Sequence, residues 1–294
     1  MRRRPLVTLA ASLAGLTLLA GSIGGPSLAT ETLPRDVRGA QGPGVHVVAV
    51  GDIANPGGAY VETAAVTRAL APERVLLAGD IAYPSATIAE LRELFDPSWG
   101  GFRPMWLPVP GNHEYRTAGA AGYREFFDET GGLYWSKKVG SWRVIGLDSE
   151  KVASAKQRKW LKSTLKKHNG KPTLVMWHRP RFSRGEHSDQ ADTAGLYNLV
   201  RRDKDVKLLI WGHDHDYERM SIPVVGRTAP LRAFVVGTGG AEQRSGTTND
   251  GRTWSEFFDN TDYGVLDLRL DTRGFSWAFV TIAGETLDSG SQTW

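Results

Sequence analysis

The stretch LLIWGHDHDYER, residues 208–219, joins an apolar run to two histidines that stand on either side of one aspartate. A short aliphatic run closed by a glycine is typical of a buried strand. In the simplest interpretation, His213 and His215 are surface turn residues. In the alternative interpretation, they bind a metal. This alternative is suggested by the placement of two histidines at one strand end in a chain that has only seven. That hypothesis requires further ligands at the ends of other strands.

Five more apolar runs end in side chains of the kind that bind metals. Runs of about four to eight aliphatic residues bounded by turn residues indicate buried strands. In open α/β folds, ligands bind just beyond the carboxyl ends of the strands, so these polar residues are expected to meet. The runs are VHVVAV (45–50) before Gly51-Asp52, RVLLA (74–78) before Gly79-Asp80, MWLPVP (105–110) before Gly111-Asn112-His113-Glu114, WRVIGL (142–147) before Asp148, and TLVMW (173–177) before His178.

Helical patterns alternate with these runs, which favours a single α/β domain over residues 45–294. They cover Val61–Leu70, Thr87–Phe95, Tyr123–Glu129 and Ala153–His168. Near the C-terminus, apolar and polar residues alternate as in strands of an antiparallel or mixed sheet. These segments are LRAFVVGTGG (231–240), YGVLDLRLD (263–271) and FSWAFVTIAG (275–284), and residues 272–274 are a predicted hairpin turn between the last two.

Residues 1–29 have the order of a secretory signal peptide, with three arginines, an apolar run at 6–20 and small residues at 27–29. A membrane span needs about 20 apolar residues, and this run is shorter. The segment RRPLV (3–7) also resembles a twin-arginine export signal. We therefore expect a secreted or extracytoplasmic protein without a stable membrane anchor after cleavage. Residues 30–44 are rich in glycine, proline and charge, which predicts a flexible lead-in.

The charge of the chain does not predict a nucleic-acid partner. The net charge is +4, and residues 1–29 hold three arginines and no acidic residue, so the remainder carries only +1. The chain has no cysteine, which excludes disulfides and thiol chemistry. The sequence leaves the oligomeric state open.

Five ordered segments resemble the motifs of the calcineurin-like metallophosphoesterases. They are GDI (51–53), GDIAY (79–83), GNHE (111–114), VMWH (175–178) and GHDH (212–215). The forms GDxxY, VxxH and GHxH, and the continuation HDYER (215–219), resemble those of purple acid phosphatases. The resemblance covers about residues 45–240. It implies an α/β fold that is a four-layer α/β/β/α sandwich of two mixed sheets flanked by helices, in a compact, single catalytic domain.

The resemblance also implies two metal ions bound by seven side chains. The ligands of the first ion would be Asp52, Asp80, Tyr83 and His215. Asp80 would bridge to the second ion, whose other ligands would be Asn112, His178 and His213. Tyrosine, with a reference pKa near 10, binds as phenolate only to a strong Lewis acid, so Tyr83 favours Fe³⁺ in the first position. The second donor set suits a divalent ion such as iron, zinc or manganese.

The implied activity is hydrolysis of small phosphomonoesters by in-line attack of metal-bound hydroxide on phosphorus. His113 adjoins Asn112, and His187 follows His178 by nine residues. Both are candidates to stabilise the transition state or to protonate the leaving oxygen. The alternatives are a phosphodiesterase or nucleotidase that uses the same ions, or a non-catalytic phosphate- or metal-binding protein.

Further polar residues near the motifs have predicted supporting roles. Arg179 and Arg181 are candidates to bind the substrate phosphate, because arginine forms paired hydrogen bonds with phosphate oxygens. Glu114, Asp214 and Glu218 are expected to accept hydrogen bonds from the ligand imidazoles.

Overall fold

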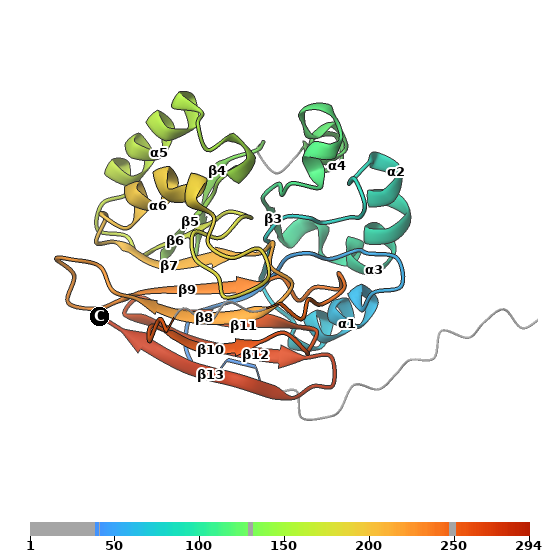
Figure 1. Ribbon diagram of the computed structural model, residues 1–294. Coiled ribbons are helices and arrows are strands. Elements are labelled where there is room, and N and C mark those ends of the chain that lie inside the picture. The colour runs from blue at the N-terminus through green and yellow to red at the C-terminus, as the bar shows by residue number, and fades with distance from the viewer. Residues whose placement is uncertain (1–38, 41, 129–131, 247–250) are drawn as a thin grey trace, which may run out of the picture. The chain divides into compact units, whose positions relative to one another are not determined.

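Two mixed β-sheets pack face to face in the computed structural model, which describes residues 39–40, 42–128, 132–246 and 251–294 (Figure 1). The order of the six-stranded sheet is β13 (Thr286–Thr293), β12 (Gly274–Thr281), β11 (Gly264–Leu270), β1 (Val45–Val50), β2 (Arg74–Leu77) and β3 (Trp106–Pro108). The order of the seven-stranded sheet is β10 (Ser255–Asp259), β8 (Tyr217–Ile222), β9 (Leu231–Val236), β7 (Val206–Trp211), β6 (Thr173–Met176), β5 (Trp142–Gly146) and β4 (Trp135–Val139). The predicted signal peptide and residues 30–38 and 41 of the predicted lead-in lie outside the described residues.

Helices cover the outer faces of both sheets, which confirms the predicted four layers α/β/β/α (Figure 1). The six-stranded sheet packs against α1 (Tyr60–Leu70), α2 (Ile88–Glu90), α3 (Asp96–Trp99) and α4 (Ala121–Phe126). The seven-stranded sheet packs against α5 (Ala155–Lys167) and α6 (Ala194–Val200). The other helical turns within the described residues are the π-helical η1 (Leu91–Phe95) and the 3₁₀ segments η2 (Gly100–Met105), η3 (Glu114–Arg116), η4 (Ala118–Ala120), η6 (Ser149–Lys151) and η7 (Ala191–Thr193).

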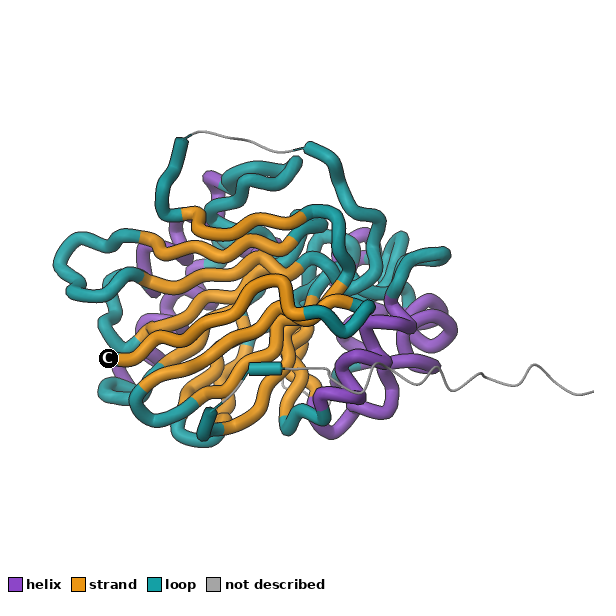
Figure 2. The backbone as a smooth tube through the Cα atoms, turned by 90° about the horizontal axis from the view of Figure 1, so that it is seen from below, coloured by secondary structure: helices purple, strands orange, loops and turns teal. Residues whose placement is uncertain are grey.

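The continuous apolar runs follow from burial on both faces of the central strands. In β1, Val47 and Ala49 face the layer between the sheets, whereas Val48 and Val50 face the helices. Successive side chains of a strand point to opposite faces, so a strand covered on both sides is apolar at every position. Figure 2 shows the strands running alongside one another with the helices outside them.

The strands that precede the candidate ligands are parallel within each sheet. β1 pairs with β2 and β2 with β3 in the six-stranded sheet, and β5 pairs with β6 and β6 with β7 in the other. Their carboxyl ends therefore reach the same edge of each sheet, as the sequence predicts.

Several elements differ from the sequence prediction. The helix predicted at Tyr123–Glu129 begins at Ala121 and ends at Phe126, and Glu129 lies outside the described residues. The sequence patterns did not indicate β4, β8, β10, β13 or α6. Strand β13 has the sequence TLDSGSQT, and most of its side chains are exposed or half-buried because it lies at the edge of its sheet. Such an edge strand gains little from apolar side chains, so it lacks the alternation that marks other strands.

Candidate metal centre

Backbone hydrogen bonds join the loops that follow β1 and β2, which fixes Asp52 relative to Asp80. The Asp52 amide donates to the carbonyl of Gly79 at 3.0 Å, and the Ile53 amide donates to the carbonyl of Asp80 at 2.9 Å. Both aspartates have positive φ angles, 58° and 49°, a conformation that aspartate tolerates better than most residues. The two loops therefore hold their carboxylates beside each other at the carboxyl ends of β1 and β2.

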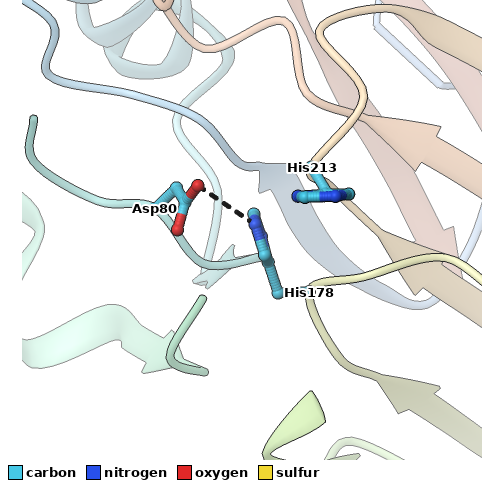
Figure 3. A group of neighbouring side chains, drawn as sticks. All are labelled: Asp80, His178 and His213. Carbon is cyan, nitrogen blue, oxygen red and sulfur yellow. Dashed lines mark ion pairs between the residues drawn. The ribbon is translucent and has the colours of Figure 1, made fainter. Parts of the chain in front are cut away.

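Asp80, His178 and His213 bring three ligand atoms from the two sheets together (Figure 3). These atoms lie within 4.8 Å of one another, and Asp80 Oδ2 is 3.2 Å from His178 Nε2. Burial alone would lower the pKa of His178, but the carboxylates of Asp80 and Asp52 raise it to about 10. Burial, helped by the charge of His178, lowers the pKa of His213 to about 2. His213 therefore stays neutral and keeps a lone pair for a cation.

Asp52, Tyr83 and His215 form a second group beside the first. The Tyr83 hydroxyl donates to Asp52 Oδ1 at 3.0 Å and lies 3.4 Å from His215 Nε2. The His213 amide donates to Asp52 Oδ2 at 2.8 Å, which connects the two groups. Burial, followed by the charge of Asp52, raises the pKa of Tyr83 well above its ordinary value. A phenolate therefore forms here only with a strong Lewis acid.

Asn112 belongs to the first group, because its Oδ1 lies 3.2 Å from His178 Nε2. The structure thus gathers all seven side chains that the family resemblance assigned to metals. Their donors are carboxylate, amide and phenol oxygens together with imidazole nitrogens, a set that suits ferric and divalent first-row ions.

Backbone carbonyls orient the imidazoles of His178 and His215, where acidic side chains were expected to do so. The carbonyl of Ala78 lies 2.8 Å from His178 Nδ1, and that of Glu242 lies 2.5 Å from His215 Nδ1. A carbonyl only accepts, so each Nδ1 carries a hydrogen and Nε2 remains the ligand atom.

The three acidic residues accept hydrogen bonds from other groups. Glu114 accepts from the backbone amides of Asp80, Ile81 and Gly111. Asp214 accepts from the amide of His187, and Glu218 accepts from the amide of Arg184 and the hydroxyl of Ser255. They hold loop backbone, not ligand side chains, because loop amides beside a buried site need acceptors.

Two glycines leave the space that the ligands occupy. A Cβ on Gly111 would lie 2.2 Å from Asp80 Oδ1. A Cβ on Gly79, whose φ is +92°, would lie 2.6 Å from His178 Nδ1. Only glycine permits this close approach of loop backbone to ligand atoms. Together with the chemistry of the donors, this cradle fits two bound metal ions.

His113 and His187 both lie against the predicted ligands. The ring of His113 is 4.3 Å from that of Tyr83, and its Nδ1 donates to the carbonyl of Pro84 at 2.6 Å. The ring of His187 stacks on that of His213 at a centroid distance of 4.3 Å. Burial lowers the pKa of His187, although the charge of Asp214 opposes the shift.

Arg179 and Arg181 are held by acidic side chains. Arg179 donates to Glu150 Oε1 at 2.6 Å and to Asp192 Oδ2 at 2.7 Å. Arg181 lies 3.8 Å from Asp189 Oδ2. A role of either arginine in binding a substrate phosphate stays a prediction.

Two other arginines, which the sequence patterns did not indicate, do lie beside the predicted ligands and proton donors. Arg116 Nη2 is 3.3 Å from His113 Nε2, and Arg244 Nε is 3.4 Å from His215 Nδ1. Arg116 is three residues beyond His113, a spacing that could have drawn attention to it. Arg244 follows β9 in a loop that carries no recognisable motif.

Comparison with known proteins identifies the family. The family description "Calcineurin-like phosphoesterase" matches residues 45–217, which is more than half of the chain. The chain therefore belongs to the calcineurin-like phosphoesterase family, and membership implies two metal ions. Acid phosphatase type 7 of Danio rerio is 26% identical over 212 residues, which cover 56% of this chain and 47% of that protein. The human protein of the same name is 25% identical over 219 residues, which cover 58% and 49%. The chain thus spans about half the length of these curated relatives.

Solved structures share the fold. A purple acid phosphatase from yellow lupin (Lupinus luteus) seeds has a TM-score of 0.69 at 19% identity, over 86% of this chain and 54% of that one. A Plasmodium structure described as "GAP50 the anchor in the inner membrane complex" has a TM-score of 0.71 at 16% identity, over 86% and 89%. At these identities the likeness concerns the fold alone.

Proposed function

We propose that the protein is an exported dinuclear-metal phosphatase that hydrolyses small phosphomonoesters. The observation that carries this proposal is the pair of ligand groups, with His113 against one and His187 against the other. The names of the acid phosphatase relatives support it. Bound ions would supply Lewis acidity toward the phosphoryl oxygens and activate a water molecule.

His113 is the first candidate to give a proton to the leaving oxygen. Its Nδ1 hydrogen is engaged by Pro84, so Nε2 is the atom that holds or releases the mobile proton. That Nε2 lies 3.8 Å from Asp80 Oδ2, which places it next to the predicted bridging ligand. His187, against His213, is the second candidate.

Export rests on the signal-peptide pattern of residues 1–29. Among the described residues, the helices are too short or too polar to span a bilayer. Purifying the protein from culture medium or an extracytoplasmic fraction, and finding its N-terminus near residue 30, would support export. Recovery of the full-length chain from the cytosol would contradict it.

The proposal predicts faster cleavage of p-nitrophenyl phosphate than of bis-p-nitrophenyl phosphate by the metal-loaded protein. The measurement is kcat/KM for both compounds, with Asp128→Asn, a substitution at an exposed carboxylate, as a control for preparation quality. A preference for the diester would favour the phosphodiesterase alternative. Phosphate binding without turnover of either compound would favour a non-catalytic binding protein.

We propose Fe³⁺ as the ion beside Tyr83, with a divalent ion of iron, zinc or manganese as the second. Iron-loaded protein is then expected to absorb in the visible through tyrosinate-to-ferric charge transfer, and Tyr83→Phe is expected to remove that band. Tyr115→Phe is a matched control, because Tyr115 also donates to a carboxylate, Asp148 Oδ2 at 2.5 Å. A colourless, fully active enzyme with two divalent ions would reject the iron assignment and leave the phosphatase proposal intact.

A further inference from the structure

The loop at residues 241–246 brings a cation to the metal centre. The Ala241 amide donates to the carbonyl of Asp52 at 2.9 Å, and the Asn260 side chain donates to the carbonyl of Arg244 at 2.7 Å. These bonds fix the loop beside His215, so that Arg244 Nε lies 3.4 Å from Nδ1 of the imidazole. The other nitrogen of the His215 ring, Nε2, lies 3.5 Å from Asp52 Oδ1 and 3.4 Å from the Tyr83 hydroxyl. The imidazole of His215 therefore lies between Arg244 and these two predicted ligands.

Arg244 remains available to an anion from solvent. Its side chain is 31% exposed, and its Nη1 pairs at 3.0 Å with Glu186, whose side chain is 47% exposed. Ion pairs in contact with water contribute little stability, so a phosphate can replace the carboxylate at small cost. Glu186 adjoins His187 in the chain, which places this pair on the side of the centre where His187 lies.

Arg116 is the corresponding cation beside the other histidine. It is the last residue of η3, in the connection that follows β3, and its side chain is exposed. Its Nη2 lies 3.3 Å from His113 Nε2, the atom that would hold the proton for the leaving group. The guanidinium groups of Arg116 and Arg244 therefore each lie against a histidine of the centre, reached from different sheets.

We propose that Arg116 and Arg244 bind the phosphoryl anion of the substrate and determine a preference for phosphomonoesters over phosphodiesters. The inference rests on the proposed phosphatase function and names its specificity residues. A monoester phosphoryl group carries up to two negative charges and three terminal oxygens, whereas a diester carries one charge and two. Two guanidinium donors in addition to two metal ions therefore stabilise the monoester more strongly.

Arg116→Gln and Arg244→Gln test this assignment in the metal-loaded protein. Each is expected to weaken binding of inorganic phosphate, measured by calorimetry, by roughly tenfold, the loss expected for one charge-assisted hydrogen bond. The kcat/KM for p-nitrophenyl phosphate is expected to fall by a similar factor. The value for bis-p-nitrophenyl phosphate is expected to change by about twofold or less, as for an exposed ion pair.

Arg92→Gln is the matched control, because Arg92 forms an exposed ion pair with Glu125 of the same 3.0 Å length outside the metal centre. Unchanged phosphate affinity in both test variants would overturn the proposal, whatever the wild-type activity. Loss of bound metal in Arg244→Gln would also overturn it, because Arg244 would then act by positioning His215. If both substitutions weakened phosphate binding but the wild-type protein cleaved neither ester, the phosphatase function would be rejected and the assignment of the two arginines to phosphate binding would stand.

Discussion

Asp80→Asn is expected to remove nearly all activity and to reduce the metal content at both ligand groups. Asp80 accepts the His113 amide on Oδ1 at 2.8 Å and faces His178 with Oδ2 at 3.2 Å. The variant replaces an anionic ligand at the centre with a neutral amide. Lewis-acid stabilisation contributes several kcal/mol and each ~1.4 kcal/mol is tenfold in rate, so kcat should fall at least about 10³-fold.

Asparagine is a better probe here than alanine. Asp80 has a φ of 49°, a conformation that asparagine adopts at lower cost than alanine, so Asp80→Asn separates loss of the charge from added backbone strain. Metal per chain is measured by elemental analysis, and folding by circular dichroism. Asp128→Asn controls for loss of a carboxylate at an exposed position. Two ions retained with normal turnover would show that Asp80 does not bridge them.

The sequence was sufficient to predict that the ligands converge. The prediction depended on which apolar runs form strands and on the polar residues that follow them, and the conformation of the loops did not enter it. VHVVAV and RVLLA are apolar at nearly every position since β1 and β2 are buried on both faces. Neighbouring parallel strands bring their carboxyl ends to one edge of the sheet, so Asp52 and Asp80 had to lie near each other. The seven-residue ligand set itself came from the family resemblance.

The sequence could not predict contacts that depend on how loops cross the site. Arg244 reaches His215 because the Ala241 amide binds the carbonyl of Asp52, a contact between residues 189 positions apart that no local pattern encodes. Glu114 follows Asn112 closely, yet its carboxylate accepts three amides from two loops. Competition between acceptors in the folded chain decides such contacts, and residue type alone does not.

Asp288→Ala is expected to cause a large loss of stability, because Asp288 joins the two sheets through side-chain hydrogen bonds. This buried β13 residue accepts from the hydroxyl of Tyr217 at 2.8 Å, Nε of Arg219 at 2.7 Å and Nε1 of Trp277 at 3.1 Å. Tyr217 and Arg219 belong to β8 and the HDYER segment, whereas Trp277 belongs to β12. Removing one member of a buried ion pair costs about 3–5 kcal/mol.

For Asp288→Ala, the lower end of the ~3–5 kcal/mol range applies, because Arg219 retains Glu256 as an ion-pair partner. A loss of about 3 kcal/mol corresponds to a fall in Tm of roughly 6–12 °C for a domain of this size. Asp288→Asn keeps an acceptor for Tyr217 and Trp277 but loses the charge that faces Arg219, so about half of that fall is expected. Glu285→Ala removes an exposed carboxylate from the same hairpin and should leave Tm unchanged. If Asp288→Ala and Glu285→Ala unfolded at the same temperature, the contacts between the HDYER segment and β13 would not contribute to holding the sheets together.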